Sequence, residues 1–272
     1  MRSPPAYVLG SDEAEVARLD AQAASIAPAT ALLLRAAGIG PGMRVLDLGT
    51  GLGHVAFALA ELVGSSGAVV GIDLATPLLD HAERRRAAGG LDQVRLLEAD
   101  ARSYRSAEPF DAVVARLLLF HLPDAVDIVR HHAEALRPGG RFVALDFDLG
   151  TVRGEPPLAL LAQALGWVEA AFRAAGADPR IGTRLQRILA EAGLAETESL
   201  GLQRYYDPHD PTAARLLTAV VRTLARPIVA AGIATEDEMR LDTLEQRLTE
   251  ESVAMDATLL LPAVVGAWGL RG

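Results

Sequence analysis

The sequence predicts an α/β fold in which an open, mostly parallel sheet carries helices on both faces. Between residues 44 and 147, short apolar runs alternate with stretches of helical pattern, which is typical of βαβ units and a parallel sheet. The first apolar run, 44–49, is bounded by glycines and predicts a strand buried on both faces. A glycine-rich turn follows this strand, and a helix begins directly after the turn.

The elements of this region follow from apolar periodicity and from glycine and proline breaks. A helix over 11–37, capped by Ser11 or Asp12 and interrupted at Pro28, precedes the break at 40–42. Thr76 is the expected N-cap of a later helix, with Pro77 in its first position. The predicted strands are 44–49, 68–74, 94–98, 110–118 and 141–147, and the predicted helices are 54–63, 76–88 and 124–136.

Beyond Gly150 the pattern becomes mainly helical. The predicted helices here are 157–175, 183–192, 211–231 and 235–253, and the predicted strands are 195–205 and, apart from Pro262, 258–268.

Composition excludes several kinds of chemistry. The 272 residues carry a net charge of −9. Proteins that bind nucleic acids usually present a basic face to the phosphates, so no nucleic-acid partner is expected. The sequence has no Cys, Lys or Asn, which excludes a thiolate nucleophile, a Schiff-base lysine and the lysine of a phosphate-binding loop. No uninterrupted apolar stretch approaches the ~18 residues of a membrane span, so we expect a cytoplasmic protein. Base rates for α/β enzymes favour a homodimer.

The glycine-rich turn is the most informative segment. Gly49, Gly51 and Gly53 follow the first strand, at the edge where open α/β sheets bind nucleosides. Glycines there allow tight backbone turns and let the main chain approach a ligand closely. Asp73 ends the next strand, 20 residues beyond Gly53, and a carboxylate at that place can accept hydrogen bonds from two ribose hydroxyls. Taken alone, this pattern also fits a dinucleotide site.

The glycine spacing is Gly-x-Gly-x-Gly, and with it the sequence resembles the class I S-adenosylmethionine-dependent methyltransferases. Segment 45–53 is similar to their first motif, with the acidic Asp47 two residues before the first glycine, and 71–73 is similar to their second. The resemblance is strong over 40–150 and loose at both ends. Further similar segments are 97–101, 110–114 with 116–121, 136–140, and Trp268-Gly269 at the close of the last strand.

The resemblance implies a Rossmann-like sheet of seven strands and S-adenosylmethionine as cofactor, with S-adenosylhomocysteine as product. Asp73 would hold the ribose, Asp100 the adenine amino group, and the Ala101 backbone amide the adenine ring. Asp47 would orient the loop or meet the amino group of the methionine part, and Arg116 would bind a carboxylate or be structural. The implied cofactor-binding residues are Asp47, Gly49, Thr50, Gly51, Gly53, Asp73, Leu74, Asp100, Ala101 and Arg116.

Candidate catalytic residues follow the fourth and fifth strands. His121 could act as a base or be a core histidine, and Asp146 and Asp148 lie on one side of the fifth strand by period-two alternation. They could bind or deprotonate a substrate, or cap the following loop. His54, His131 and His132 are expected to be structural or surface residues. Candidate substrate residues are Tyr7, Tyr205, Tyr206 and His209, for which packing roles are as well founded.

The resemblance also implies an organisation within a single domain, 1–272. An N-terminal helical lid (1–30) and a helical cap insertion (208–256) would cover an α/β core formed by 31–205 and 257–272, as in many small-molecule members. The catechol type of this family uses a metal held by Asp and Asn, and the sequence has no Asn, so no metal is expected. The apolar insertion favours a hydrophobic acceptor, such as a secondary metabolite or quinone.

Two alternatives stay open at this point. One is an NAD(P)-dependent oxidoreductase on a similar sheet, against which stand the glycine spacing and the absence of lysine. The other is a non-catalytic, methyltransferase-like protein that binds the nucleoside without transferring a methyl group.

Overall fold

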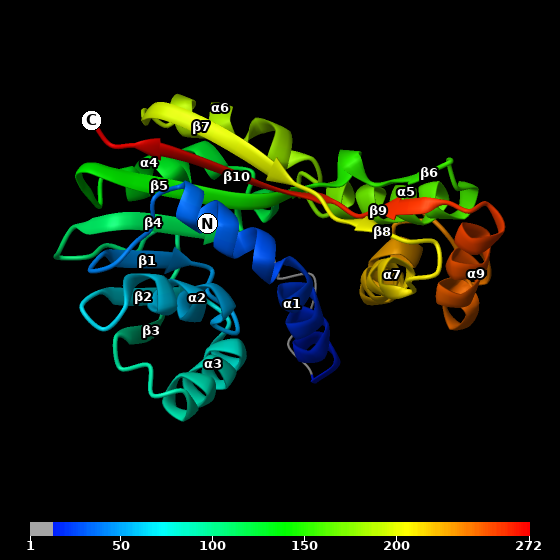
Figure 1. Cartoon of the computed structure of the whole chain (residues 1–272), viewed down its shortest axis with the longest axis horizontal. Coiled ribbons are helices and arrows are strands. Elements are labelled where there is room, and N and C mark those ends of the chain that lie inside the picture. The colour runs from blue at the N-terminus through cyan, green and yellow to red at the C-terminus, as the bar shows by residue number, and fades with distance from the viewer. Residues whose placement is uncertain (1–12) are drawn as a thin grey trace. The chain divides into compact units, whose positions relative to one another are not determined.

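The computed structural model describes residues 13–272 (Figure 1). These residues form two compact units that are described separately. The sheet unit comprises 23–148, 180–202 and 264–272, and the helical unit comprises 149–179, 203–263 and the described residues up to 22.

The sheet unit is built on seven strands in the order β3-β2-β1-β4-β5-β10-β7 (Figure 1). Strand β1 pairs in parallel with both β2 and β4, and only the pairing of β10 with β7 is shown to be antiparallel. The predicted mostly parallel, seven-stranded sheet is therefore confirmed. The strands are β1 (Arg44–Leu48), β2 (Ala68–Asp73), β3 (Val94–Glu98), β4 (Phe110–Arg116), β5 (Leu136–Asp148), β7 (Ala195–Leu202) and β10 (Ala263–Leu270).

Alternate residues of the central strands enter two separate cores. Val45 packs with residues of α1 (Glu13–Ala36) and α2 (His54–Val63), whereas its neighbour Leu46 packs with residues of α4 (Ala125–Ala133) and α6 (Leu185–Glu191). Helix α3 (Thr76–Ala88) contacts β3. Helices therefore cover both faces of the sheet, and this explains why the strands carry continuous apolar runs.

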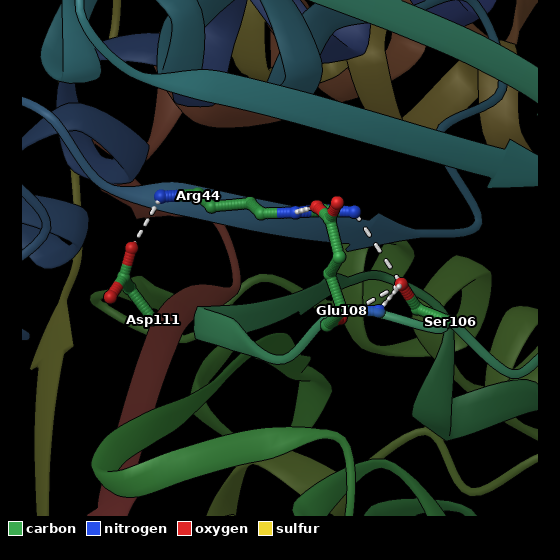
Figure 2. A network of polar contacts seen from close by, with 4 residues as sticks. All are labelled: Arg44, Ser106, Glu108 and Asp111. Carbon is green, nitrogen blue, oxygen red and sulfur yellow. Dashed lines mark hydrogen bonds and ion pairs between the residues drawn. The ribbon is translucent and has the colours of Figure 1, made fainter.

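The amino ends of the central strands are closed by a polar network around Arg44, shown in Figure 2. The Arg44 backbone N–H donates to Asp111 Oδ2 at 2.6 Å, and its guanidinium donates to Glu108 Oε2 at 3.2 Å and to Ser106 Oγ at 3.4 Å. The guanidinium carbon also lies 4.4 Å from the centre of the Phe110 ring. These groups bind one another and tie the start of β1 to the start of β4 and to the loop before it. Ligands of open α/β sheets bind at the opposite, carboxyl ends of the strands.

In the helical unit, three helices pack on one another, and a small antiparallel sheet accompanies them. Helix α7 (Thr212–Ala230) contacts both α5 (Ala159–Ala174) and α9 (Leu241–Ala254). The Glu251 carboxylate of α9 accepts the Ala159 and Leu160 N–H groups at 3.0 and 3.2 Å, which satisfies free donors at the start of α5. The sheet has the order β6 (Arg153–Glu155), β9 (Thr258–Leu260) and β8 (Tyr205–Tyr206).

Several boundaries differ from the sequence prediction. Pro28 lies inside an unbroken α1, and Thr76 is a helical residue that follows the N-cap Ala75. The predicted helix 235–253 is split by Arg240, whose φ of 45° ends α8 (Glu236–Met239) before α9 begins. The predicted strands 195–205 and 258–268 each divide between the two sheets. Segment 149–179, which the sequence prediction assigned to the core, clusters with the helical unit because α5 packs on α7 and α9.

None of the helices formed by residues 13–272 is long and apolar enough to cross a membrane.

Candidate functional site

The glycine loop folds as a tight turn at the carboxyl end of β1. Gly49, Gly51 and Gly53 have φ values of 69°, 51° and 82°, which L-residues with side chains rarely adopt. The Thr50 N–H donates to the Ile72 carbonyl at 2.9 Å, and the Gly53 N–H donates to the Thr50 carbonyl at 2.8 Å. The loop is therefore held against β2, and Gly53 serves as the N-cap of α2.

Asp73, the last residue of β2, binds the glycine loop directly. Its Oδ2 accepts the Gly51 N–H at 2.8 Å, and its Oδ1 accepts the Ala75 N–H at 2.8 Å. Each carboxylate oxygen has further acceptor capacity, so these bonds leave room for a ligand's hydroxyl groups. Leu74, the next residue, is 53% exposed. The expected roles of Asp73 and Leu74 toward a nucleoside stay predictions.

Asp47 is buried, and the half-buried Arg116 lies on the same face of the sheet, near enough for its charge to act on Asp47. Asp47 lies opposite Val114 in the β1–β4 register, and period-two alternation places Arg116, two residues later, on the same face as Val114. Asp47 is 1% exposed, and burial raises its pKa from 3.8 to about 7, against the opposing attraction of the Thr50 hydroxyl and the Arg116 guanidinium. Burial lowers the pKa of Arg116, whose Nη1 donates to Thr30 Oγ1 at 3.3 Å.

Two polar atoms at this place have no normal hydrogen-bond partner in the part of the chain that the structure describes. They are Asp47 Oδ2 and Thr50 Oγ1, both buried; the Thr50 hydroxyl lies near enough to lower the pKa of Asp47 but does not reach normal hydrogen-bond geometry. Native proteins satisfy nearly all buried polar atoms, so an orphaned carboxylate oxygen beside a glycine loop indicates a place where a polar ligand binds. A Cβ at Gly51 would meet no atom closer than 3.9 Å, so the backbone is accessible there.

The loop after β3 lies next to the end of β2. The Ala99 N–H donates to the Asp73 carbonyl at 2.9 Å, which places Asp100 and Ala101 beside the residues of the glycine site. Asp100 Oδ1 accepts the Arg102 N–H at 2.8 Å, and the Asp100 carbonyl accepts the Ser103 and Tyr104 N–H groups at 3.0 and 2.8 Å. The loop is therefore a compact turn with the Asp100 side chain half-buried.

His132 was expected to be a surface residue, and this is wrong. It is 1% exposed, its Nε2 lies 2.6 Å from the Ala101 carbonyl oxygen, and burial lowers its pKa from 6.5 to about 4. His131 Nε2 lies 2.9 Å from the Tyr104 carbonyl oxygen. The available signal was the i, i+3, i+4, i+7 spacing of Ala125, Ile128, Val129 and His132, which places the histidine on the apolar face of α4.

The candidate catalytic carboxylates are both buried at the end of β5, while Phe147 between them is less so. Asp146 Oδ2 accepts the Phe120 N–H at 3.2 Å and thereby ties β5 to the loop that follows β4. The Asp148 side chain packs beside Gly182. His121 ends the short helix Leu119–His121, and its ring centre is 3.7 Å from that of Phe120. Catalytic roles for these three residues stay predictions.

The candidate substrate residues with described positions all lie in the helical unit. Tyr205 and Tyr206 form β8, with Tyr205 65% exposed and Tyr206 buried beneath the Arg204 guanidinium, whose carbon is 4.8 Å from the ring centre. His209 is exposed. Tyr7 lies outside the described residues. Tyr206 contributes to packing, and the substrate roles of Tyr205, Tyr206 and His209 stay predictions.

No group of three or more His, Cys, Asp or Glu side chains within residues 13–272 could hold a metal ion.

The chain is similar to known methyltransferases. A family model described as "Methyltransferase domain" matches residues 39–193. The aklanonic acid methyltransferase DauC of Streptomyces sp. strain C5 is 39% identical over 119 residues, which are 43% of this chain and 54% of that protein. The nocamycin O-methyltransferase of Saccharothrix syringae is 37% identical over 127 residues, or 46% of this chain and 43% of that protein. The chain thus spans about half the length of these relatives.

One similar solved structure extends the comparison across the chain. It is the phosphoethanolamine N-methyltransferase 2 of Haemonchus contortus in complex with S-adenosyl-L-methionine. The TM-score is 0.56 at 18% identity, and the match covers 90% of this chain and 52% of that one. At this identity the likeness shows a shared fold.

Proposed function

The chain belongs to the methyltransferase domain family, and we propose that it transfers a methyl group from S-adenosylmethionine to an O, N or C nucleophile of a small, hydrophobic metabolite. The observation that carries this proposal is the glycine loop, whose Gly51 N–H is held by the Asp73 carboxylate at 2.8 Å beside an orphaned buried carboxylate oxygen of Asp47. A loop of this kind presents backbone donors and a narrow, side-chain-free surface to a nucleoside.

The residues around the loop fit the proposed cofactor. S-adenosylmethionine supplies an electrophilic methyl group on its sulfonium sulfur, so the protein has to bind, orient and exclude water. Asp73 ends β2 next to the loop and would accept the ribose hydroxyls, with the exposed Leu74 beside the adenine. Asp100 and the Ala101 amide, which the Ala99 bond ties to Asp73, would bind the adenine edge.

Asp47 and Arg116, on the same face of the sheet, fit the amino-acid part of the cofactor. The Arg116 guanidinium has lost solvation, and its only hydrogen bond to a described side chain is the one to Thr30, so a ligand carboxylate would replace the missing water. Asp47 Oδ2 would accept from the ammonium group. An ammonium beside Asp47 would favour its charged form, which burial disfavours in the free protein.

The nature of the acceptor is supported by the relatives. Two of them, 39% and 37% identical over their matched segments, are named as methyltransferases of aklanonic acid and nocamycin, so a secondary metabolite is the acceptor class we propose. A general base is needed only if the acceptor carries a proton that has to leave, and His121, Asp146 and Asp148 are the candidates. The cytoplasmic location and the homodimer stay predictions. Neither the oxidoreductase nor the non-catalytic alternative is supported by the comparisons.

Calorimetric titration tests the proposal. We expect the protein to bind S-adenosylhomocysteine and not NAD or NADP. Asp73→Ala removes a charged acceptor and should weaken binding about 10- to 100-fold, whereas Asp80→Ala, which changes an exposed aspartate on α3, should leave it unchanged. Binding of a nicotinamide nucleotide, or of no nucleoside at all, would contradict the proposed function.

A further inference from the structure

Helix α4 holds the Asp100 loop at three points. The Asp124 carboxylate, directly before α4, accepts from Arg102 Nε at 3.0 Å and from Arg102 Nη2 at 3.1 Å. Two turns later, His131 and His132 reach the Tyr104 and Ala101 carbonyl oxygens at 2.9 and 2.6 Å. The loop 100–104 is thus bound to α4 and its N-cap through Ala101, Arg102 and Tyr104.

The bond from His132 is the one that bears on the ligand site. A carbonyl oxygen can only accept, so Nε2 carries the proton, and Nδ1 is unprotonated and has no partner among residues 13–272. Because His132 is 1% exposed, water does not compete for its Nε2 proton. A hydrogen bond from such a buried donor is stronger than one made in water.

One peptide unit links His132 to the Asp100 side chain. The Ala101 carbonyl and the Arg102 N–H belong to the same planar group. Its oxygen is held by His132 at 2.6 Å, and its N–H is held by Asp100 Oδ1 at 2.8 Å. The plane of this peptide therefore determines where the Asp100 carboxylate points. Asp100 Oδ2 and the Ala101 N–H have no hydrogen-bond partner among the described residues, so they remain as an acceptor and a donor for a ligand.

We propose that His132 is a positioning residue that sets the specificity of the site for adenine by fixing the Ala101–Arg102 peptide and, through it, the Asp100 carboxylate. An acceptor beside a donor matches the edge of adenine, which offers the 6-amino group as donor and a ring nitrogen as acceptor. A 6-oxo base offers the opposite pattern and leaves both protein groups unpaired. The inference deepens the proposed function and rests on it.

Two ligands and matched variants test this role. The ligands are S-adenosylhomocysteine and S-inosylhomocysteine, in which a carbonyl oxygen replaces the 6-amino group, and the measured quantity is the ratio of their dissociation constants. His132→Gln keeps an amide donor near the place of Nε2, whereas His132→Leu keeps a similar volume without a donor. We expect the wild type and His132→Gln to prefer the adenosyl ligand, and His132→Leu to lose about tenfold of that preference.

The outcomes separate the inference from the proposed function. If the wild type binds neither ligand, the proposed function is wrong. If the wild type prefers the adenosyl ligand and His132→Leu keeps the same preference, the positioning role is wrong even where overall affinity or stability falls, because a merely structural residue would weaken both ligands alike. Should His132→Leu fail to fold, His132→Asn takes its place, since its shorter amide does not reach the Ala101 carbonyl, and the same two results decide.

Discussion

Asp73 Oδ2 accepts the Gly51 N–H at 2.8 Å and so joins the end of β2 to the glycine loop that follows β1. The same carboxylate accepts the Ala75 N–H through its other oxygen at 2.8 Å. One side chain therefore supports the loop and would also bind the ribose. These two roles can be separated because an amide in place of the carboxylate keeps one acceptor oxygen but loses the charge.

Replacement of Asp73 by Asn and by Ala should accordingly have different effects on stability. Asp73→Asn retains one backbone bond, whereas Asp73→Ala loses both and should lower the free energy of unfolding by about 1–3 kcal/mol. Both variants should weaken S-adenosylhomocysteine binding, since neither offers two charged acceptors to the ribose. Urea unfolding and calorimetry measure the two effects. If Asp73→Asn binds as tightly as the wild type, Asp73 acts on the loop alone.

Asp47 should make the folded state less stable as pH rises. Its pKa is about 7 in the folded chain and near 3.8 when unfolded, so between these values the folded state holds the extra proton. The contribution of Asp47 is fully present below pH 3.8 and is lost as pH rises through about 7, at a slope of about 1.4 kcal/mol per pH unit. Asp47→Asn stays neutral and should gain stability relative to the wild type over this range.

Urea unfolding of both proteins from about pH 5 to about pH 8 checks this sign. The measured quantity is the difference in unfolding free energy between Asp47→Asn and the wild type at each pH. A difference that stays constant across the range would mean that Asp47 is already ionised in the folded chain, with Arg116 and the Thr50 hydroxyl outweighing its burial.

Local signals account for the parts of the fold that the sequence predicted well. Helices 54–63 and 76–88 and strand 94–98 have the predicted bounds, because glycine, proline and apolar spacing act within a few residues. The sheet of β6, β9 and β8 was not predicted, since its strands have two or three residues and come from distant segments. Such short pairings depend on tertiary packing and leave no periodic signal.

In the candidate site too, the positions of residues along the chain were predictable, whereas their tertiary contacts were not. The positions of Asp73 and Asp100 after their strands were predictable from spacing, but the bonds that each carboxylate makes to nearby backbone were not. The proximity of Asp47 and Arg116 depends on the register of β1 against β4, which single-strand patterns do not encode. His132 was missed because a histidine in a helix was assumed to be exposed, although its spacing from Ile128 and Val129 indicated burial.

Gly53→Ala should be destabilising through both backbone strain and a steric clash. Gly53 is left-handed, with a φ of 82° and a ψ of 4°, and this conformation costs an alanine about 1–2 kcal/mol. A Cβ at Gly53 would also lie 2.5 Å from the Phe57 ring, and displacing the ring should add about 1–3 kcal/mol. Urea unfolding measures the total loss, and a loss no larger than the backbone strain alone would show that Phe57 moves aside without cost.

Arg116→Gln should weaken binding of the amino-acid part of the cofactor and leave binding of its nucleoside part unchanged. Arg116 is half-buried, and its only hydrogen bond to a described side chain is to Thr30, so its charge is available for a ligand carboxylate. We expect the affinity for S-adenosylhomocysteine to fall about 10- to 100-fold, as for loss of a charged hydrogen bond. The affinity for 5′-methylthioadenosine, which has the same nucleoside but no amino-acid group, should be unchanged.

The comparison of these two ligands guards against an indirect effect, because removing the charge of Arg116 also changes the surroundings of Asp47. Arg84→Gln, which changes an exposed arginine on α3, controls for the loss of one positive charge from the protein. A fall in affinity for both ligands would mean that Arg116 supports the glycine loop through Asp47. No fall for either would mean that the guanidinium faces the methyl acceptor or has only a structural role, and the carboxylate would then need another partner.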